Sequence, residues 1–101
     1  MIMQTFKHSR AILFCKDDCL PCTWTKGELL KIFDTNPEYK QNITTLRKET
    51  HPSLVGAYQV ERFPTLVIVD SLGEEQGKLV GGENIRSQLL GILFALNAST
   101  K

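Results

Sequence analysis

Two cysteines separated by two residues are the part of this sequence best suited to chemistry. They lie in Cys19-Leu20-Pro21-Cys22, where a segment with helical apolar spacing begins. Cysteines three positions apart at a helix start lie about one turn from each other, so their sulfurs can approach disulfide geometry. The pattern therefore predicts a redox-active dithiol and a thiol-disulfide oxidoreductase with Cys19 and Cys22 as its catalytic residues.

The expected helix gives the two sulfurs different roles. Cys19 would lie at the exposed end, where unpaired N–H groups and the helix dipole stabilise a thiolate and lower a pKa that is about 8.5 in free cysteine. Cys19 is thus the predicted nucleophile, and Cys22, one turn deeper, is the predicted resolving residue. Pro21 suits the first turn because it has no N–H to lose there.

The charges before the pair suggest the direction of the reaction. Asp17 and Asp18 disfavour a thiolate on Cys19 by like-charge repulsion, and Lys16 offsets them only in part. We therefore expect a Cys19 thiol that is less acidic than in strongly oxidising dithiol proteins. A protein of this kind would act as an electron donor.

Metal binding is an alternative use of the same cysteines. Two cysteines at this spacing form half of a zinc site, and Cys15-x3-Cys19-x2-Cys22 has the spacing of a cluster ligand set in radical enzymes, although the chain is too short for their barrel. His8 and His51 have no ligand-like neighbours, so no metal and no other cofactor is expected. Cys15 ends an apolar run and is interpreted as a buried apolar side chain, with redox regulation as the alternative.

Length and composition fit one small domain. The chain has 101 residues, with twelve basic and eleven acidic side chains spread along it, which leaves no basic stripe for nucleic acid. No segment approaches the roughly 20 apolar residues that span a bilayer, and the N-terminus has no apolar segment of signal-peptide length. Three cysteines crowded between positions 15 and 22 are a poor framework for a secreted domain. We expect a cytoplasmic monomer without membrane or nucleic-acid partners.

The elements that must position the cysteines follow the order strand, helix, strand, helix, hairpin, helix, which indicates an α/β fold. The strand before the pair is a continuous apolar run, as expected for a strand that is covered on both faces. Asn84 is the expected cap of the last helix. The expected strands are residues 11–15, 43–46, 65–69 and 78–80, and the expected helices are residues 21–33, 52–58 and 85–96.

Over residues 11–97 the sequence resembles the thioredoxin family. The segment Tyr58-Gln59-Val60-Glu61-Arg62-Phe63-Pro64-Thr65-Leu66 is similar to the thioredoxin segment in which a cis-proline precedes a threonine and the central strand. The resemblance implies one thioredoxin-like domain over residues 1–101, with a central mixed four-stranded sheet flanked by about three helices. It also implies that Pro64 is the cis-proline and that Phe63 presents its backbone to an incoming peptide.

The resemblance implies an apolar docking patch around the dithiol, in which Gly81 leaves room for a partner's chain. Trp24 belongs either to the core or to the rim of this site. The implied partners are protein disulfide substrates, with a thioredoxin reductase as the source of electrons. The expected members of the patch are Leu20, Pro21, Phe63, Pro64 and Gly81.

The sequence also departs from the thioredoxin pattern. Asp18 and Leu20 stand where thioredoxins usually have Trp and Gly, and Leu13 replaces their usual buried aspartate. The short segment before Cys19 resembles a glutaredoxin, and Gly81-Gly82-Glu83 is similar to the glycine pair with a nearby acid that glutaredoxins use for glutathione. Glutathione dependence is therefore the alternative within the enzyme class. A metal or iron-sulfur carrier that uses the same cysteines, or a docking module, is the alternative from another class.

Overall fold

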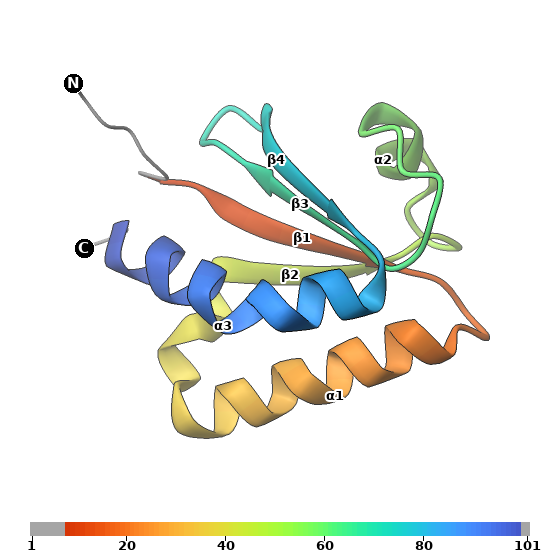
Figure 1. Cartoon of the computed structure of the whole chain (residues 1–101). Coiled ribbons are helices and arrows are strands. Elements are labelled where there is room, and N and C mark those ends of the chain that lie inside the picture. Colours follow the sequence, from red (N-terminus) through yellow and green to blue (C-terminus); the bar gives the residue numbers. More distant parts are fainter. Residues whose placement is uncertain (1–7, 100–101) are drawn as a thin grey trace.

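One mixed sheet of four strands forms the centre of the structure, a computed structural model that describes residues 8–99 (Figure 1). Its order is β2-β1-β3-β4, with β1 parallel to β2, β1 antiparallel to β3, and β3 antiparallel to β4. The predicted fold class is confirmed. The strands are β1 (Arg10–Cys15), β2 (Ile43–Arg47), β3 (Thr65–Val69) and β4 (Glu75–Val80).

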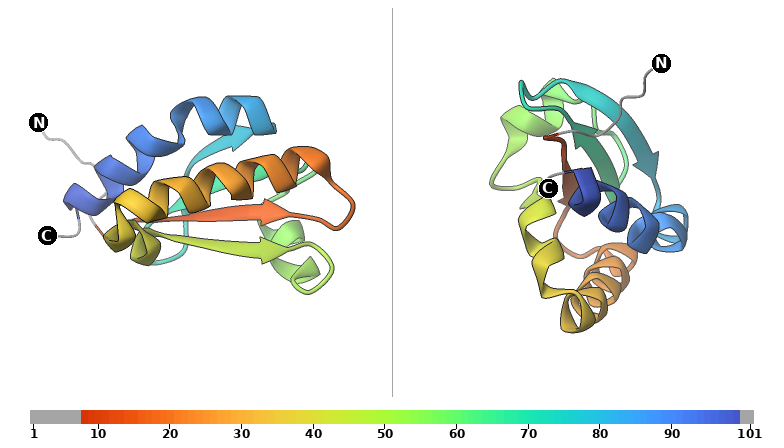
Figure 2. Two further views of the ribbon diagram at one scale, coloured as in Figure 1. Left: turned by 90° about the horizontal axis from the view of Figure 1, so that it is seen from below. Right: turned by 90° about the vertical axis from the view of Figure 1, so that its left-hand side faces the viewer.

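Helices cover both faces of this sheet. Helices α1 (Leu20–Thr35) and α3 (Gly82–Ser99) lie side by side on one face (Figure 2), and α2 (Pro52–Ala57) lies on the other. A short 3-10 helix, η1 (Pro37–Asn42), joins α1 to β2. No helix in the described part of the chain combines the length and the apolarity needed to cross a bilayer. The N-terminal residues, whose sequence was found too polar for a signal peptide, lie outside the described residues.

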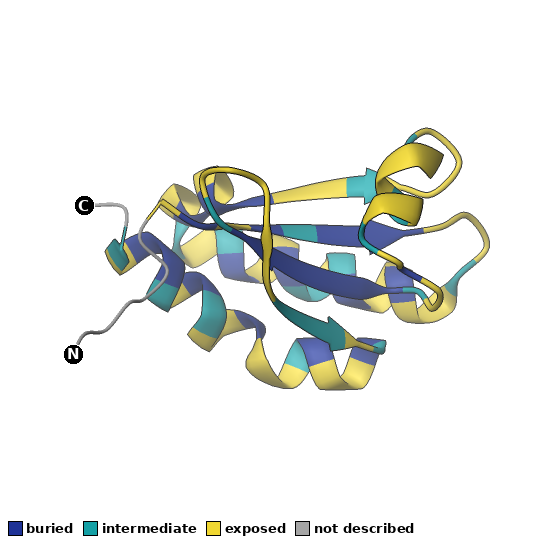
Figure 3. Ribbon diagram, turned by 90° about the horizontal axis from the view of Figure 1, so that it is seen from above, coloured by how far each residue is buried: buried dark blue, intermediate teal, exposed yellow. Residues whose placement is uncertain are grey.

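The core has one layer on each face of the sheet because successive side chains along β1 point to opposite faces. In Figure 3 the central strands β1 and β3 are mostly coloured as buried. Leu13 and Cys15 belong to the layer that contains the buried residues of α1 and α3. Phe14 belongs to the layer with Val60 and Val67, on the side of α2. Strand β1 is thus buried on both faces, as its apolar run predicts.

The last helix begins earlier than the sequence pattern predicts. Asn84 was expected as its cap, but α3 begins at Gly82, and Asn84 lies within the first turn. The reason is the backbone of Gly81, which has a φ of 96° and accepts a hydrogen bond from the Ile85 N–H at 3.0 Å. Glycine adopts this left-handed conformation at little cost, so the helix begins directly where β4 ends.

Candidate dithiol site

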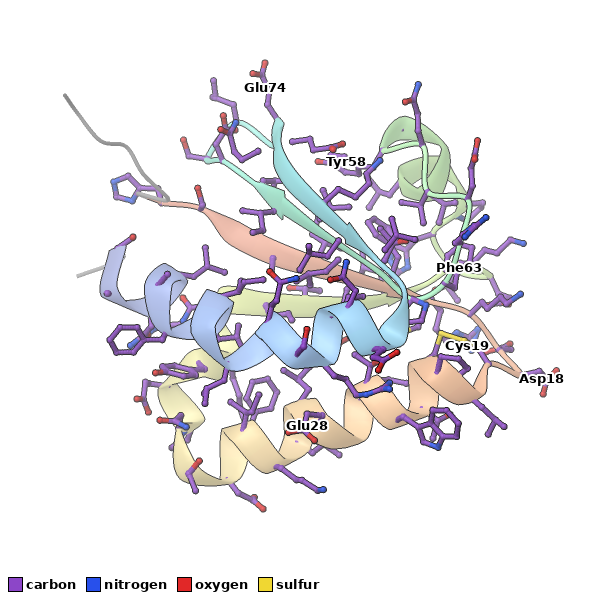
Figure 4. The ribbon with its side chains drawn as sticks, in the orientation of Figure 1. Asp18, Cys19, Glu28, Tyr58, Phe63 and Glu74 are labelled. Carbon is purple, nitrogen blue, oxygen red and sulfur yellow. A yellow bond between two sulfur atoms is a disulfide. The ribbon has the colours of Figure 1, made fainter. Side chains whose placement is uncertain are left out.

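Cys19 and Cys22 form a disulfide at the N-terminus of α1 (Figure 4). Their Cα atoms are 5.2 Å apart. Cys19 is the N-cap of the helix, and its Sγ accepts a hydrogen bond from the Cys22 N–H at 3.2 Å. Cys19 is half-buried whereas Cys22 is only 1% exposed. An attacking reagent therefore reaches Cys19 first, and a thiolate there would face the unpaired N–H groups of the first helical turn.

The loop before β3 lies against this disulfide. The Cys19 Sγ is 3.8 Å from the carbonyl oxygen of Phe63, and the Phe63–Pro64 peptide bond is cis. The N–H of Gly81 donates a hydrogen bond to the carbonyl oxygen of Pro64 at 2.9 Å. The fold thus brings three separate segments of the chain together at the start of α1.

The residues expected to form the docking patch differ in exposure. Leu20 is 64% exposed and Pro21 is also exposed, whereas Phe63 and Gly81 are half-buried. Pro64 is fully buried, so it sets the path of the backbone and offers no side-chain surface. Apart from Gly81 itself and its two chain neighbours, no described residue has an atom within 4 Å of where a Cβ on Gly81 would stand, which leaves open space beside the loop.

Three further residues, Trp24, Gly82 and Arg86, lie beside the site. The sequence left Trp24 between core and rim and did not place the other two there. Trp24 lies on the surface of α1, with its ring 5.8 Å from the guanidinium carbon of Arg86. A Cβ on Gly82 would lie 3.1 Å from the Pro21 Cβ and 2.8 Å from a guanidinium nitrogen of Arg86. Gly82 thus allows the first turns of α1 and α3 to approach closely. The adjacent glycines were the only sequence signal for this contact.

The acidic residues before Cys19 are partly balanced by their neighbours. The Asp17 carboxylate forms an ion pair with Arg47 at 3.6 Å, and the Asp17 N–H donates a hydrogen bond to the Glu49 carboxylate at 3.1 Å. That hydrogen bond is the main reason why the pKa of the exposed Glu49 carboxyl lies below its usual value. The Asp18 side chain points away from the disulfide (Figure 4). The repulsion expected from the sequence is therefore weakened at Asp17 by Arg47.

Within residues 8–99, no group of three or more His, Cys, Asp or Glu side chains is placed to hold a metal ion. His51, the residue before α2, has its Nδ1 2.9 Å from the Thr50 hydroxyl. Cys15 is free and fully buried in β1.

The buried Cys15 thiol is expected to resist alkylation in the folded, reduced protein. Burial raises its pKa, and the charge of Lys26 opposes this effect only in part, so its thiolate fraction at neutral pH is small. Peptide mass spectrometry after iodoacetamide treatment should show modified Cys19 and unmodified Cys15. Unfolding in urea should make Cys15 reactive. Modification of Cys15 and Cys19 at equal rates in the folded protein would show that Cys15 is not a buried, unreactive thiol.

The fold matches solved structures of thioredoxins. Thioredoxin from Malassezia sympodialis superposes with a TM-score of 0.72 over 92% of this chain and 78% of that chain, at 18% identity. For Fasciola hepatica thioredoxin the TM-score is 0.70, over 89% and 81% at 17% identity, and for oxidised mitochondrial thioredoxin 3 from Saccharomyces cerevisiae it is 0.65, over 87% and 78% at 20% identity. No protein-family model and no curated protein matches the sequence. The chain therefore has the thioredoxin fold, with the Cys19–Cys22 disulfide at the start of its first helix.

Proposed function

We propose that this protein is a thiol-disulfide oxidoreductase that reduces disulfides in protein substrates. The observation that carries the proposal is the position of Cys19. Its sulfur caps α1, accepts the Cys22 N–H at 3.2 Å and is the more accessible of the pair. The fold supports the same reaction class, because solved structures of thioredoxins superpose on most of this chain.

The proposed reaction is two successive thiol-disulfide exchanges. In the reduced protein, the Cys19 thiolate attacks one sulfur of a client disulfide and forms a mixed disulfide, while the other client sulfur leaves as a thiolate and takes up a proton. Cys22 then loses its proton to solvent and attacks the Cys19 sulfur. This step forms the Cys19–Cys22 disulfide and releases the second client sulfur. Two electrons pass from the dithiol to the client.

The surface around the disulfide is proposed to dock the client. An extended client segment would lie along the backbone of Phe63, whose carbonyl oxygen is 3.8 Å from the Cys19 sulfur. Leu20 and Pro21 would supply apolar contacts from α1, and Pro64 would fix the path of the loop. The open space beside Gly81 would admit the client's backbone.

Re-reduction by a thioredoxin reductase completes the proposed cycle, with the protein acting as a monomer in the reducing cytoplasm. A reducing compartment suits a chain that carries the unpaired Cys15 beside a dithiol. The electron source can be tested with a peptide that contains one disulfide. We expect sustained reduction when NADPH and thioredoxin reductase are supplied, and at least about tenfold slower reduction with NADPH, glutathione and glutathione reductase.

Each outcome of this assay has a definite meaning. Faster turnover with glutathione would replace the thioredoxin-like cycle by the glutaredoxin-like alternative. If protein that has been reduced chemically and then desalted transfers no electrons to the peptide, the proposed function is refuted. Cys15→Ser serves as the matched cysteine control, and near-normal turnover is expected for it.

A further inference from the structure

Two lysines lie over the aromatic ring next to the reactive sulfur. The Lys16 Nζ is 6.0 Å and the Lys48 Nζ is 5.7 Å from the centroid of the Phe63 ring. Distances of this size are within the range in which a cation is attracted to an aromatic face. Since the carbonyl oxygen of Phe63 is 3.8 Å from the Cys19 sulfur, two positive charges adjoin the place where a client is proposed to dock.

The sheet itself places these lysines. In the parallel pair β1 and β2, Cys15 is opposite Arg47, so the next residues, Lys16 and Lys48, leave the sheet side by side. The Lys48 N–H donates a hydrogen bond to the Cys15 carbonyl oxygen at 2.7 Å, which extends this pairing. In the antiparallel pair β1 and β3, Phe14 is opposite Thr65. Continued by two residues, this register brings Phe63 beside Lys16, in agreement with the 6.0 Å between the Lys16 Nζ and the Phe63 ring. The three residues therefore lie in one row at the end of the sheet where the disulfide is found.

Both ammonium groups are available to a ligand. Lys16 and Lys48 are exposed, and Lys16 also lines an open pocket of about 500 Å³ that adjoins Cys19. Neither lysine forms an ion pair within residues 8–99. Two of the nearby carboxylates have other partners, since Asp17 is paired with Arg47 and Glu49 accepts the Asp17 N–H. The third, Asp18, lines the same pocket as Lys16, with its side chain turned away from the disulfide (Figure 4). Lys48 also contributes to the low pKa of Glu49, so the Glu49 carboxylate would compete with a ligand's carboxylate for Lys48.

We infer that Lys16 and Lys48 select client proteins that carry an acidic side chain beside the disulfide to be reduced. The inference rests on the proposed function and adds a substrate class to it. A client segment laid along Phe63 would bring its neighbouring carboxylate to the two ammonium groups. Opposite charges accelerate association and like charges disfavour the wrong partner, so a client with basic neighbours would be reduced more slowly.

The test uses two peptides of identical length, each closed by one disulfide and flanked either by aspartates or by lysines. The measured quantity is the second-order rate constant of their reduction by the reduced protein at low ionic strength. We expect the acidic peptide to react about tenfold faster. The preference should shrink when the salt concentration exceeds about 0.1 M, where charges more than about 10 Å apart are screened.

Variants assign the preference to the two lysines. The double variant K16Q/K48Q should reduce both peptides at similar rates, and K16E/K48E should favour the basic peptide. Lys40→Gln is the matched control, because the Lys40 Nζ also lies 6.0 Å from a phenylalanine ring, that of Phe33 in the last turns of α1. It should keep the wild-type preference. Circular dichroism confirms that each variant is folded.

The outcomes separate this inference from the proposed function. Equal rates for the two peptides with the wild-type protein, or an unchanged preference in folded K16Q/K48Q, would overturn the role of the lysines while reduction itself continues. Failure of the wild-type protein to reduce either peptide would refute the proposed function and the substrate class with it.

Discussion

Replacing Cys19 by serine is expected to lower the rate of disulfide reduction by at least about a thousandfold, because it removes the nucleophile of a covalent mechanism. Serine keeps the shape of the N-cap and can still accept the N–H of residue 22, so α1 should persist. Its hydroxyl stays protonated at neutral pH and cannot form a disulfide. Activity is measured with chemically reduced protein and a peptide disulfide, and the fold is checked by circular dichroism.

Cys22→Ser should give a different defect, because the first exchange needs only Cys19. The Cys19 thiolate would still attack the client, but no second thiol would resolve the product. Mass spectrometry should therefore show a client covalently bound to the variant in a stoichiometric, reductant-sensitive complex. The burial of Cys22 and the accessibility of Cys19 predict this division of roles.

The outcomes of the two variants can contradict the mechanism in separate ways. Full activity without Cys19 would refute it. A trapped client on Cys19→Ser together with an inert Cys22→Ser would show that the two roles are reversed. Cys15→Ser controls for the loss of any thiol, and both its activity and its lack of trapping should resemble those of the wild-type protein.

Local sequence patterns predicted the elements that have a regular apolar pattern. Strand β3 is buried at all five positions, and its apolar run predicted it. Helix α1 ends at Thr35, and the apolar spacing and the turn residues after it predicted this helix and its end. Strand β4 was predicted to begin at Lys78, but it begins at Glu75. It lies at an edge of the sheet, where its polar residues meet solvent and leave no apolar pattern to read.

The dithiol was predictable because it depends on residues close in sequence, whereas its surroundings depend on strand order. The spacing of Cys19 and Cys22 is local. The approach of Lys48 and Phe63 to Lys16 requires that β1 lies between β2 and β3, which the sequence pattern alone does not specify. For the same reason, the repulsion that the sequence predicted between Cys19 and the acids before it took no account of Arg47, which lies in β2 and pairs with Asp17.

Leu13→Asp is expected to destabilise the fold strongly at neutral pH. Leu13 is fully buried in the core layer that also contains Cys22, at the position where thioredoxins usually carry an aspartate. The buried residues of the described chain include polar ones such as Thr25 but no charged one, so an ionised carboxylate would be buried without a charged partner. The expected loss is about 3–5 kcal/mol of the free energy of unfolding, a large share of the stability of a small domain.

The pH dependence of this loss identifies its cause. Burial raises the folded-state pKa of the new carboxyl above its unfolded value of about 3.9, so the folded state binds more protons and the free energy of unfolding falls as pH rises above that value. Urea unfolding at several pH values, each compared with the wild-type protein, should therefore show the smallest loss near pH 4. Leu13→Asn has a similar shape but does not titrate, so its loss should stay constant. Identical curves for the two variants would show that water or a rearranged partner reaches residue 13.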